Sequence, residues 1–320
     1  MCQKTKVSFE IEKDEGQFEL TIWQPEGEPK AVIQILHGMA EHIDRYDQTA
    51  RDLCAAGYVV AGHNHKGHGP SCGQSELGYF YDRDGWLHTV EDAHYVSALL
   101  YEKFPGKKLV LLGHSMGSFM AREYAIRYGR ELSALVLSGT GYQPGAKCEF
   151  ARLLALASPR KKPAKLVNKI AFSGNNKPFE PARTPFDWLS RDEKQVDKYI
   201  ADDRCGFTFT GGAFADFFGG LCALARVERL SDMPDDLPVY FMSGDRDPVG
   251  QMGKGVLTVV NQFRNAGMSD VTVHLYKDAR HELFNELNRT EVISDLIAWL
   301  NEKMNKRLRA VENKSAESEE

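Results

Sequence analysis

Short runs of apolar residues alternate along the chain with stretches in which apolar positions recur at helical spacing. We interpret the runs as strands buried on both faces of a sheet, at residues 31–36, 58–61, 109–112 and 134–137. Between them, the spacing predicts helices that end at Gly57 and near Phe104, and a further helix after Gly117. Because strand and helix alternate, the pattern predicts βαβ units and a mostly parallel sheet.

Strand patterns also occur before and after this region. Residues 7–12 and 18–23 alternate apolar and polar positions on either side of a turn at 14–16, which predicts an antiparallel hairpin at the sheet edge. Towards the C-terminus the pattern predicts two more strands, a helix between them and a closing helix, at residues 238–242, 271–276, 251–267 and 293–300.

The strand series is interrupted between residues 141 and 232, and we interpret this stretch as a helical insertion, the cap, over the sheet. The core then consists of residues 1–140 and 233–310, and the polar residues 311–320 are expected to be a disordered tail. A cluster of aromatic residues in the cap either lines a cleft for an acyl chain or packs the cap onto the core. It comprises Phe207, Phe209, Phe214, Phe217 and Phe218.

Composition and charge narrow the range of functions. A chain of 320 residues can bury one large core and carry an insertion, and 27% charged residues is typical of a soluble globular protein. The net charge of -5 argues against a nucleic-acid-binding protein. Because residues 1–9 lack the apolar core of a signal peptide and no apolar run reaches membrane-spanning length, we expect a cytoplasmic protein. The oligomeric state stays open.

Cysteine and histidine spacing gives no support for a metal site. The six cysteines contain no C-x-x-C pair, so reduced thiols are expected and a disulfide framework is not. His63, His65 and His68 lie close together, but the stretch has no carboxylate and its glycines and Pro70 indicate a turn. We therefore expect neither a metal nor another cofactor.

One motif lies at the junction of a predicted strand and a predicted helix. Residues 113–117 read G-H-S-M-G, directly after the apolar run 109–112. Gly113 and Gly117 have no side chains to block a tight turn, so Ser115 can be held in a strained conformation with its hydroxyl exposed. G-x-S-x-G between a strand and a helix is the nucleophile elbow of the α/β-hydrolases.

A serine nucleophile needs a base, and the base needs an acceptor that fixes its tautomer. In this fold the order along the chain is serine, acid, histidine, with the last two after later strands. His281 follows the last predicted strand, whereas Asp245 and Asp247 both follow the preceding one and physical reasoning does not choose between them. The expected oxyanion donors are the backbone N–H groups of Met116 and Met39.

Five segments together resemble the monoacylglycerol lipase and lysophospholipase family of α/β-hydrolases. They are HGMAEHIDRY at 37–46, HNHKGHGPS at 63–71, GHSMG at 113–117, GDRDPV at 244–249 and ARHE at 279–282. The resemblance implies an eight-stranded, mostly parallel sheet flanked by helices, with residues 141–232 as a cap over an acyl channel. It also implies that Asp247 is the acid.

The resemblance suggests further substrate-binding residues. Glu41 and Arg45 match positions that organise the glycerol end of the pocket, although a structural ion pair is an equal interpretation. Phe284 stands where relatives with glycerol specificity carry a histidine, which puts monoacylglycerol itself in doubt. The basic segment 160–169 fits either transient contact of the cap with a membrane surface or an ordinary solvated face.

We therefore predict a serine hydrolase that cleaves small-molecule esters of apolar acyl chains, of monoacylglycerol or lysophospholipid type, through an acyl-enzyme. A proline-type aminopeptidase could use the same triad on amides, and it would need an acidic anchor such as Asp202, Asp203 or Asp216. A third possibility is a ligand-binding protein without activity, which the intact set of Ser115, Asp247 and His281 disfavours.

Overall fold

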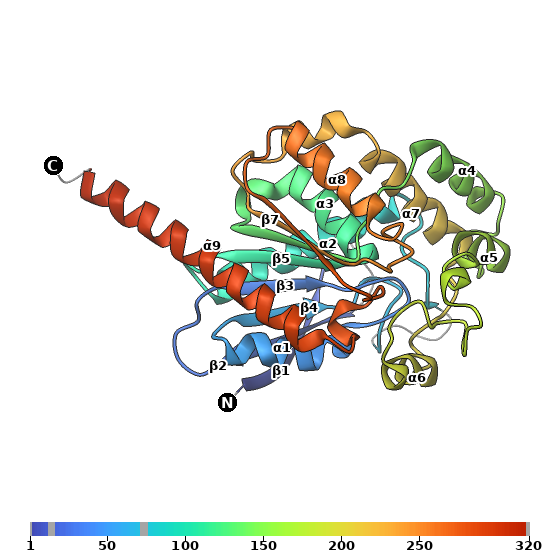
Figure 1. The fold of residues 1–320 in the computed structure, drawn as a ribbon, viewed down its shortest axis with the longest axis horizontal. Helices are drawn as coiled ribbons and strands as arrows, with labels where there is room; N and C mark the ends of the chain where they lie inside the picture. Colours follow the sequence, from blue (N-terminus) through green and yellow to red (C-terminus); the bar gives the residue numbers. More distant parts are fainter. Residues whose placement is uncertain (1, 12–16, 71–75, 318–320) are drawn as a thin grey trace.

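The computed structural model describes residues 2–11, 17–70 and 76–317, and of residues 17 and 306–317 it describes the backbone only. Its sheet has eight strands in the order β1-β2-β4-β3-β5-β6-β7-β8 (Figure 1). The strands are β1 (Cys2–Glu10), β2 (Gln17–Pro25), β3 (Val32–Leu36), β4 (Val59–His63), β5 (Leu109–His114), β6 (Ala134–Ser138), β7 (Val239–Gly244) and β8 (Val271–Tyr276). β1 and β2 pair antiparallel, β2 pairs antiparallel with β4, and the remaining pairs are parallel.

Helices cover both faces of the sheet. α1 (Asp47–Ala55) and α9 (Arg289–Glu317) cover one face, while α2 (Gly85–Lys103), α3 (Met116–Tyr128) and α8 (Lys254–Asn265) cover the other (Figure 1). Successive strand residues point to opposite faces, so Val110 packs under α1 and α9 and Leu111 under α2 and α3. Because both faces are covered, the central strands are almost entirely apolar, with the buried Gln34 of β3 hydrogen-bonded to Ala93 and Ser97.

Four α-helices lie between β6 and β7, in the stretch expected to form the cap. They are α4 (Gly145–Leu156), α5 (Lys165–Phe172), α6 (Glu193–Ala201) and α7 (Gly211–Leu224). α7 packs against α2, where Gly220 lies on the indole ring of Trp86. Short 3-10 helices complete the described chain: η1 (Ile43–Tyr46), η3 (Gly129–Glu131), η4 (Lys177–Phe179), η5 (Val227–Asp232) and η6 (Leu283–Asn285).

The expected strands agree with the observed ones to within a few residues. The hairpin at the sheet edge forms from β1 and β2, while its predicted turn at 14–16 lies outside the described residues. The helix expected from residue 251 begins at Lys254, because Gln251, Met252 and Gly253 all adopt positive φ. None of the helices in the described ranges is long and apolar enough to span a membrane.

The tail differs from its expectation. Residues 311–320 are expected to be disordered, yet the backbone of α9 continues as a helix to Glu317 and projects from the body of the molecule (Figure 1). The physical reason lies in composition: lysine, arginine, alanine and glutamate favour helix even in a segment that does not pack in a core. Residues 318–320 lie outside the described part of the chain.

The contact between α7 and α2 predicts opposite effects for two neighbouring glycines. A methyl group on Gly220 would overlap the Trp86 ring, whereas one on Gly219 would meet only Arg152 Cδ at 3.6 Å. Gly220→Ala should therefore lower the free energy of unfolding by about 1–3 kcal/mol through overpacking. Gly219→Ala should raise it by about 0.5–1 kcal/mol, since alanine is the better helix former.

Urea unfolding of the two variants beside the wild type tests this contact. Equal changes in stability for Gly219→Ala and Gly220→Ala would contradict the packing of α7 on Trp86.

Candidate active site

Ser115 lies in the sharp turn between β5 and α3. Its backbone has φ 52° and ψ -119°, a strained combination for a residue with a side chain. A methyl group on Gly117 would overlap the carbonyl oxygen of Leu36, and one on Gly113 would overlap that of Gly117. Only glycine fits at these two positions, so the motif spacing is a packing requirement of the turn.

Three side chains from different strand ends form a hydrogen-bonded row. His281 Nε2 lies 2.8 Å from Ser115 Oγ, and His281 Nδ1 lies 3.0 Å from Asp247 Oδ2. Asp247 follows β7 and is fully buried, and His281 follows β8 and is 2% exposed. An ionised carboxylate only accepts hydrogen bonds, so Nδ1–H donates to Asp247 and Nε2 is free to accept from the Ser115 hydroxyl.

The turn after β7 brings Asp247, and not Asp245, to His281. The second oxygen of Asp247, Oδ1, accepts the backbone N–H of Val249 at 2.8 Å, which fixes the carboxylate. The Asp245 side chain has no hydrogen-bond partner at Oδ1 among the described residues. Of the two aspartates that the sequence leaves open, it is Asp247 whose carboxylate lies beside His281.

Burial and charge act in opposite directions on the histidine. Burial alone would lower the pKa of His281, but the Asp247 carboxylate stabilises the imidazolium, and the net effect raises the pKa above its ordinary value. The ring of His114 lies 4.9 Å from that of His281. Burial, aided by the charge of His281, lowers the pKa of His114 to about 3, so His114 stays neutral beside it.

Two further residues beside Ser115, Met39 and Met116, have backbone N–H groups that could act as donors. Met39 follows β3 and Met116 begins α3, and both line the cavity that contains the Ser115 hydroxyl. Neither N–H has a hydrogen-bond acceptor within the described part of the chain. Two unpaired N–H groups beside a serine hydroxyl can stabilise negative charge on an oxygen attached to the attacked carbon.

A cavity of about 700 Å³ extends from Ser115 and His281 into the space beneath the cap. Its core side includes Met39 and Met116, and its cap side is mainly apolar and aromatic, including Phe150, Leu154, Phe207, Phe217 and Phe218. Phe209 and Phe214 are absent from this lining and pack inside the protein. The aromatic cluster of the cap is therefore divided between two roles. Three of its rings line the cavity, and the other two pack in the protein interior.

Comparison with known proteins agrees with this geometry. A family model described as "Serine aminopeptidase, S33" matches residues 27–288. The chain belongs to this family.

Sequence relatives of the protein align with most of its length. It is 29% identical over 280 residues to a monoacylglycerol lipase of Mycolicibacterium smegmatis, covering 87% of this chain and 91% of the relative. It is also 29% identical to a monoglyceride lipase of Mus musculus, with coverage of 88% and 86%.

Solved structures show the same α/β-hydrolase fold. A thermostable carboxyl esterase from Bacillus coagulans, in complex with glycerol, superposes with a TM-score of 0.87 at 29% identity, covering 94% of this chain and 99% of that one. A structure titled "Lipase (Open form)" superposes with a TM-score of 0.85 at 28% identity, covering 95% and 100%. The expected fold class is confirmed.

Of the substrate-binding residues expected from the sequence, only Glu41 lines the cavity. The guanidinium of Arg45 is held between Glu41 and Glu282, with two hydrogen bonds of 2.7 Å to Glu282, and stacks on the ring of Tyr199. Burial raises the pKa of Glu282, but the charge of Arg45 outweighs it and lowers the pKa to about 2. Arg45 therefore fits the structural ion pair better than a substrate contact.

Phe284 also lies away from the cavity, which corrects its expected role. Its ring is 5% exposed and packs near Tyr46, in the apolar layer beneath α1 and α9. The short 3-10 helix η6 turns this side chain back into the core after His281. Its identity therefore says nothing direct about the head group of a substrate.

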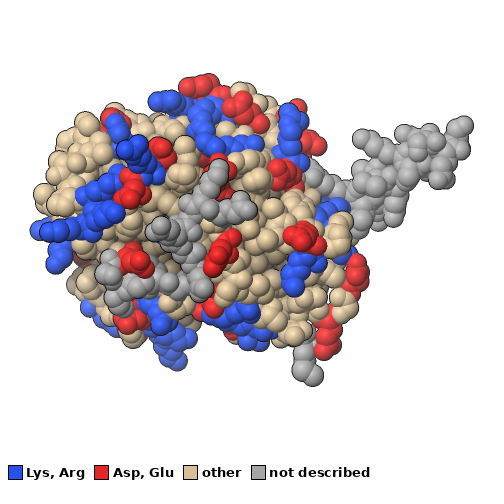
Figure 2. All heavy atoms as spheres, turned by 180° about the vertical axis from the view of Figure 1, so that it is seen from behind, with Lys and Arg blue, Asp and Glu red and all other residues tan. Residues whose placement is uncertain are grey.

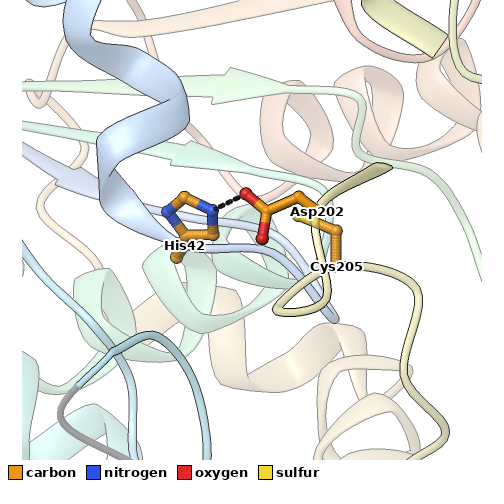
Figure 3. A group of neighbouring side chains, drawn as sticks. All are labelled: His42, Asp202 and Cys205. Carbon is orange, nitrogen blue, oxygen red and sulfur yellow. Dashed lines mark hydrogen bonds and ion pairs between the residues drawn. The ribbon is translucent and has the colours of Figure 1, made fainter. Parts of the chain in front are cut away.

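One group of side chains in the described residues has the spacing of metal ligands. His42, Asp202 and Cys205 lie with their ligand atoms within 4.8 Å of one another (Figure 3). His42 Nε2 already pairs with Asp202 Oδ2 at 2.8 Å, and burial raises the pKa of the Cys205 thiol far from the thiolate form that metals require. The chemistry of this group suits a polar contact between the core and the cap better than a metal site.

Two further residues at this site were not predicted from the sequence. The indole of Trp188 lies 5.0 Å from the His281 ring, and the Tyr199 hydroxyl reaches the Ala40 carbonyl oxygen at 3.1 Å. Both come from the cap, whose segments lack the strand-end placement that singled out Ser115 and His281. No periodic pattern or motif would have selected them.

The geometry predicts different outcomes for the two aspartates after β7. Asp247→Asn should reduce kcat for an ester by about 10⁴-fold, because a neutral amide no longer fixes the Nδ1–H tautomer of His281. Asp245→Asn is the matched control and should leave kcat within about threefold, since Asp245 does not contact the histidine. Steady-state kinetics with a p-nitrophenyl ester compares the two; an equal loss in both would contradict the assignment.

The same pair predicts a pH dependence. His281 can accept a proton only when neutral, so kcat/KM should fall as the pH drops through its raised pKa. Removing the Asp247 charge lowers this pKa, and the residual activity of Asp247→Asn should therefore have its acidic limb at lower pH than the wild type. If the acidic limb of the pH profile lay at the same pH in Asp247→Asn as in the wild type, His281 would be excluded as the titrating base.

Proposed function

We propose that this carboxylic ester hydrolase cleaves monoacyl esters of apolar chains, of monoacylglycerol or lysophospholipid type, through an acyl-enzyme. The observation that carries the proposal is a row of hydrogen-bonded Ser115, His281 and Asp247 at the end of a mainly apolar cavity of about 700 Å³. That volume lies within the range of about 300–1,000 Å³ that binding sites for small molecules occupy.

The chemistry follows from the positions of the three side chains. His281 Nε2 takes the hydroxyl proton as Ser115 Oγ attacks the ester carbonyl carbon, and the N–H groups of Met39 and Met116 stabilise the oxyanion. The C–O bond to the alcohol then breaks, and His281 returns the proton to the leaving alkoxide. Water repeats the sequence on the acyl-enzyme and releases the carboxylic acid and free Ser115.

An aminopeptidase is supported less well by the cavity. It would need a free carboxylate to bind the amino terminus of a peptide, and none of the candidates Asp202, Asp203 and Asp216 lines the cavity. The acids that do line it, Glu41 and Glu282, are both paired with Arg45. Among the described residues, the cavity lining thus offers no unpaired carboxylate to bind an ammonium group.

The outer face of the cap favours contact with aggregated lipid as part of this function. Leu153 on α4 and Leu166 on α5 are 55% and 67% exposed, and Leu166 is flanked by exposed Lys165 and by the rest of the basic segment 160–169. In Figure 2, which shows the molecule from behind, Lys and Arg side chains lie beside uncharged surface at the cap end. Apolar side chains next to lysines suit the surface of a membrane or micelle.

The substrate class can be tested with p-nitrophenyl esters from acetate to palmitate. We expect the highest kcat/KM for a medium or long chain, because the apolar lining gains free energy with each buried methylene, about 0.8 kcal/mol. Ser115→Ala should lose all but a residual activity and should not react with a fluorophosphonate. Wild-type protein that cleaves no ester and takes up no label would favour a ligand-binding protein instead.

The surface contact has its own test. The double variant Leu153→Ser/Leu166→Ser should hydrolyse emulsified long-chain esters about 3- to 10-fold more slowly, since each loses apolar area for the lipid surface. Its activity on a dissolved short ester should be unchanged, because neither residue lines the cavity. Leu257→Ser, at a 42% exposed leucine on α8, is the control; an equal loss there would contradict a cap-specific contact.

A further inference from the structure

Met39 lies in a loop at residues 37–41, which we call the oxyanion loop. The backbone N–H groups on either side of Met39 are both hydrogen-bonded. The Gly38 N–H donates to Glu41 Oε1 at 2.5 Å, and the Ala40 N–H donates to His68 Nε2 at 3.2 Å. Of the three consecutive N–H groups at residues 38–40, only that of Met39 has no acceptor in the described chain, and Met39 lines the cavity. The neighbours of Met39 thus hold its peptide in place.

Ala40 is the strained member of this loop. Its φ of 53° lies in the left-handed region, which costs an alanine roughly 1–2 kcal/mol unless the surroundings stabilise it. Its carbonyl oxygen accepts the Tyr199 hydroxyl at 3.1 Å and the Gly206 N–H at 2.9 Å, both from the cap. Among the described residues, the only partner of its N–H is His68, from the core loop that follows β4.

The environment of His68 selects a neutral ring with an acceptor at Nε2. Its Nδ1 lies 3.1 Å from the Lys66 carbonyl oxygen, which can only accept, so Nδ1 carries the proton. Nε2 is then the atom that can accept the Ala40 N–H. Burial lowers the pKa of His68 to about 4, so the ring stays neutral at neutral pH.

Aromatic rings also fix the orientation of His68. Its ring centroid lies 5.2 Å from that of Phe207, 5.3 Å from Phe209 and 6.0 Å from Phe80, and the side chain is 1% exposed. The ring does not line the cavity. His68 can therefore affect the reaction only through its neighbours, which are the oxyanion loop and the cavity-lining ring of Phe207.

We propose that His68 is a positioning residue for ester hydrolysis: its neutral Nε2 holds the Ala40 peptide so that the Met39 N–H points at the oxyanion. This inference rests on the proposed function and adds a residue that does not itself meet the substrate. Loss of the acceptor leaves the buried Ala40 N–H unpaired and lets the strained peptide rotate, which turns the adjoining Met39 N–H away from the oxyanion.

Two variants separate the hydrogen bond from the shape of the side chain. His68→Phe keeps a ring of similar shape in the aromatic surroundings and removes the acceptor, whereas His68→Gln restores an acceptor oxygen near the position of Nε2. The control is His63→Phe, because His63 is a nearby buried histidine whose two ring nitrogens have no partner in the described residues, so it makes no side-chain hydrogen bond to the oxyanion loop.

The readout is kcat and KM for a short p-nitrophenyl ester, together with the affinity for an alkyl boronic acid that forms a tetrahedral adduct on Ser115. His68→Phe should lower kcat about 10- to 100-fold, a partial loss of one oxyanion donor, with KM within about threefold. Boronate affinity should fall by a similar factor. His68→Gln should recover most of kcat, and His63→Phe should stay within about threefold of the wild type.

Several outcomes would overturn the inference: wild-type kcat in His68→Phe, an equal loss in His63→Phe, or a change in KM alone. If His68→Phe does not fold, nitrogen-15 NMR of the wild-type histidines decides, since an Nε2–H tautomer of His68 would exclude the hydrogen bond. Wild-type protein that cleaves no ester would refute the proposed function, whereas active wild type with an equally active His68→Phe would refute this inference alone.

Discussion

The close approach of two backbone segments governs the whole site. The turn after β5 packs so tightly on the end of β3 that Gly117 rests on the carbonyl oxygen of Leu36, with no room for a side chain. This contact sets Ser115 beside the loop that contains Met39, because both segments leave neighbouring parallel strands at the same edge of the sheet. Under the proposed function, this packing brings a nucleophile and an oxyanion donor together from residues far apart in sequence.

The same sheet topology brings Asp247 and His281 to the site. β7 and β8 end at the edge where β5 ends, so the turns after them deliver Asp247 and His281 to Ser115. The cap enters between β6 and β7, and its helices cover this edge without breaking the sheet. The sheet supplies the reacting groups and the cap supplies the apolar walls, which explains how the fold keeps one chemistry while the wall residues vary the substrate.

Much of this could be predicted from the sequence because the informative residues follow buried strands. Ser115 and His281 stand in the turns that follow predicted strands, and that placement identified them. Asp245 and Asp247 leave the same strand two residues apart, so only the three-dimensional turn distinguishes them. Arg45 lies within a motif and Phe284 just after one, yet neither lines the cavity; each sits in a short 3-10 helix, whose side-chain directions the sequence does not reveal. His68 and Tyr199 act through backbone groups of a distant loop, and no periodicity encodes such a contact.

The two hydrogen bonds from the cap to the Ala40 carbonyl oxygen couple the cap to the oxyanion loop thermodynamically. Any displacement of residues 199–206 from the core removes both donors from a strained peptide. A molecule that binds beneath the cap and holds it down must then favour the ordered loop, and the ordered loop must favour binding of that molecule by the same factor. Binding in the cavity and ordering of the oxyanion loop are, in this sense, two linked equilibria, and each favours the other.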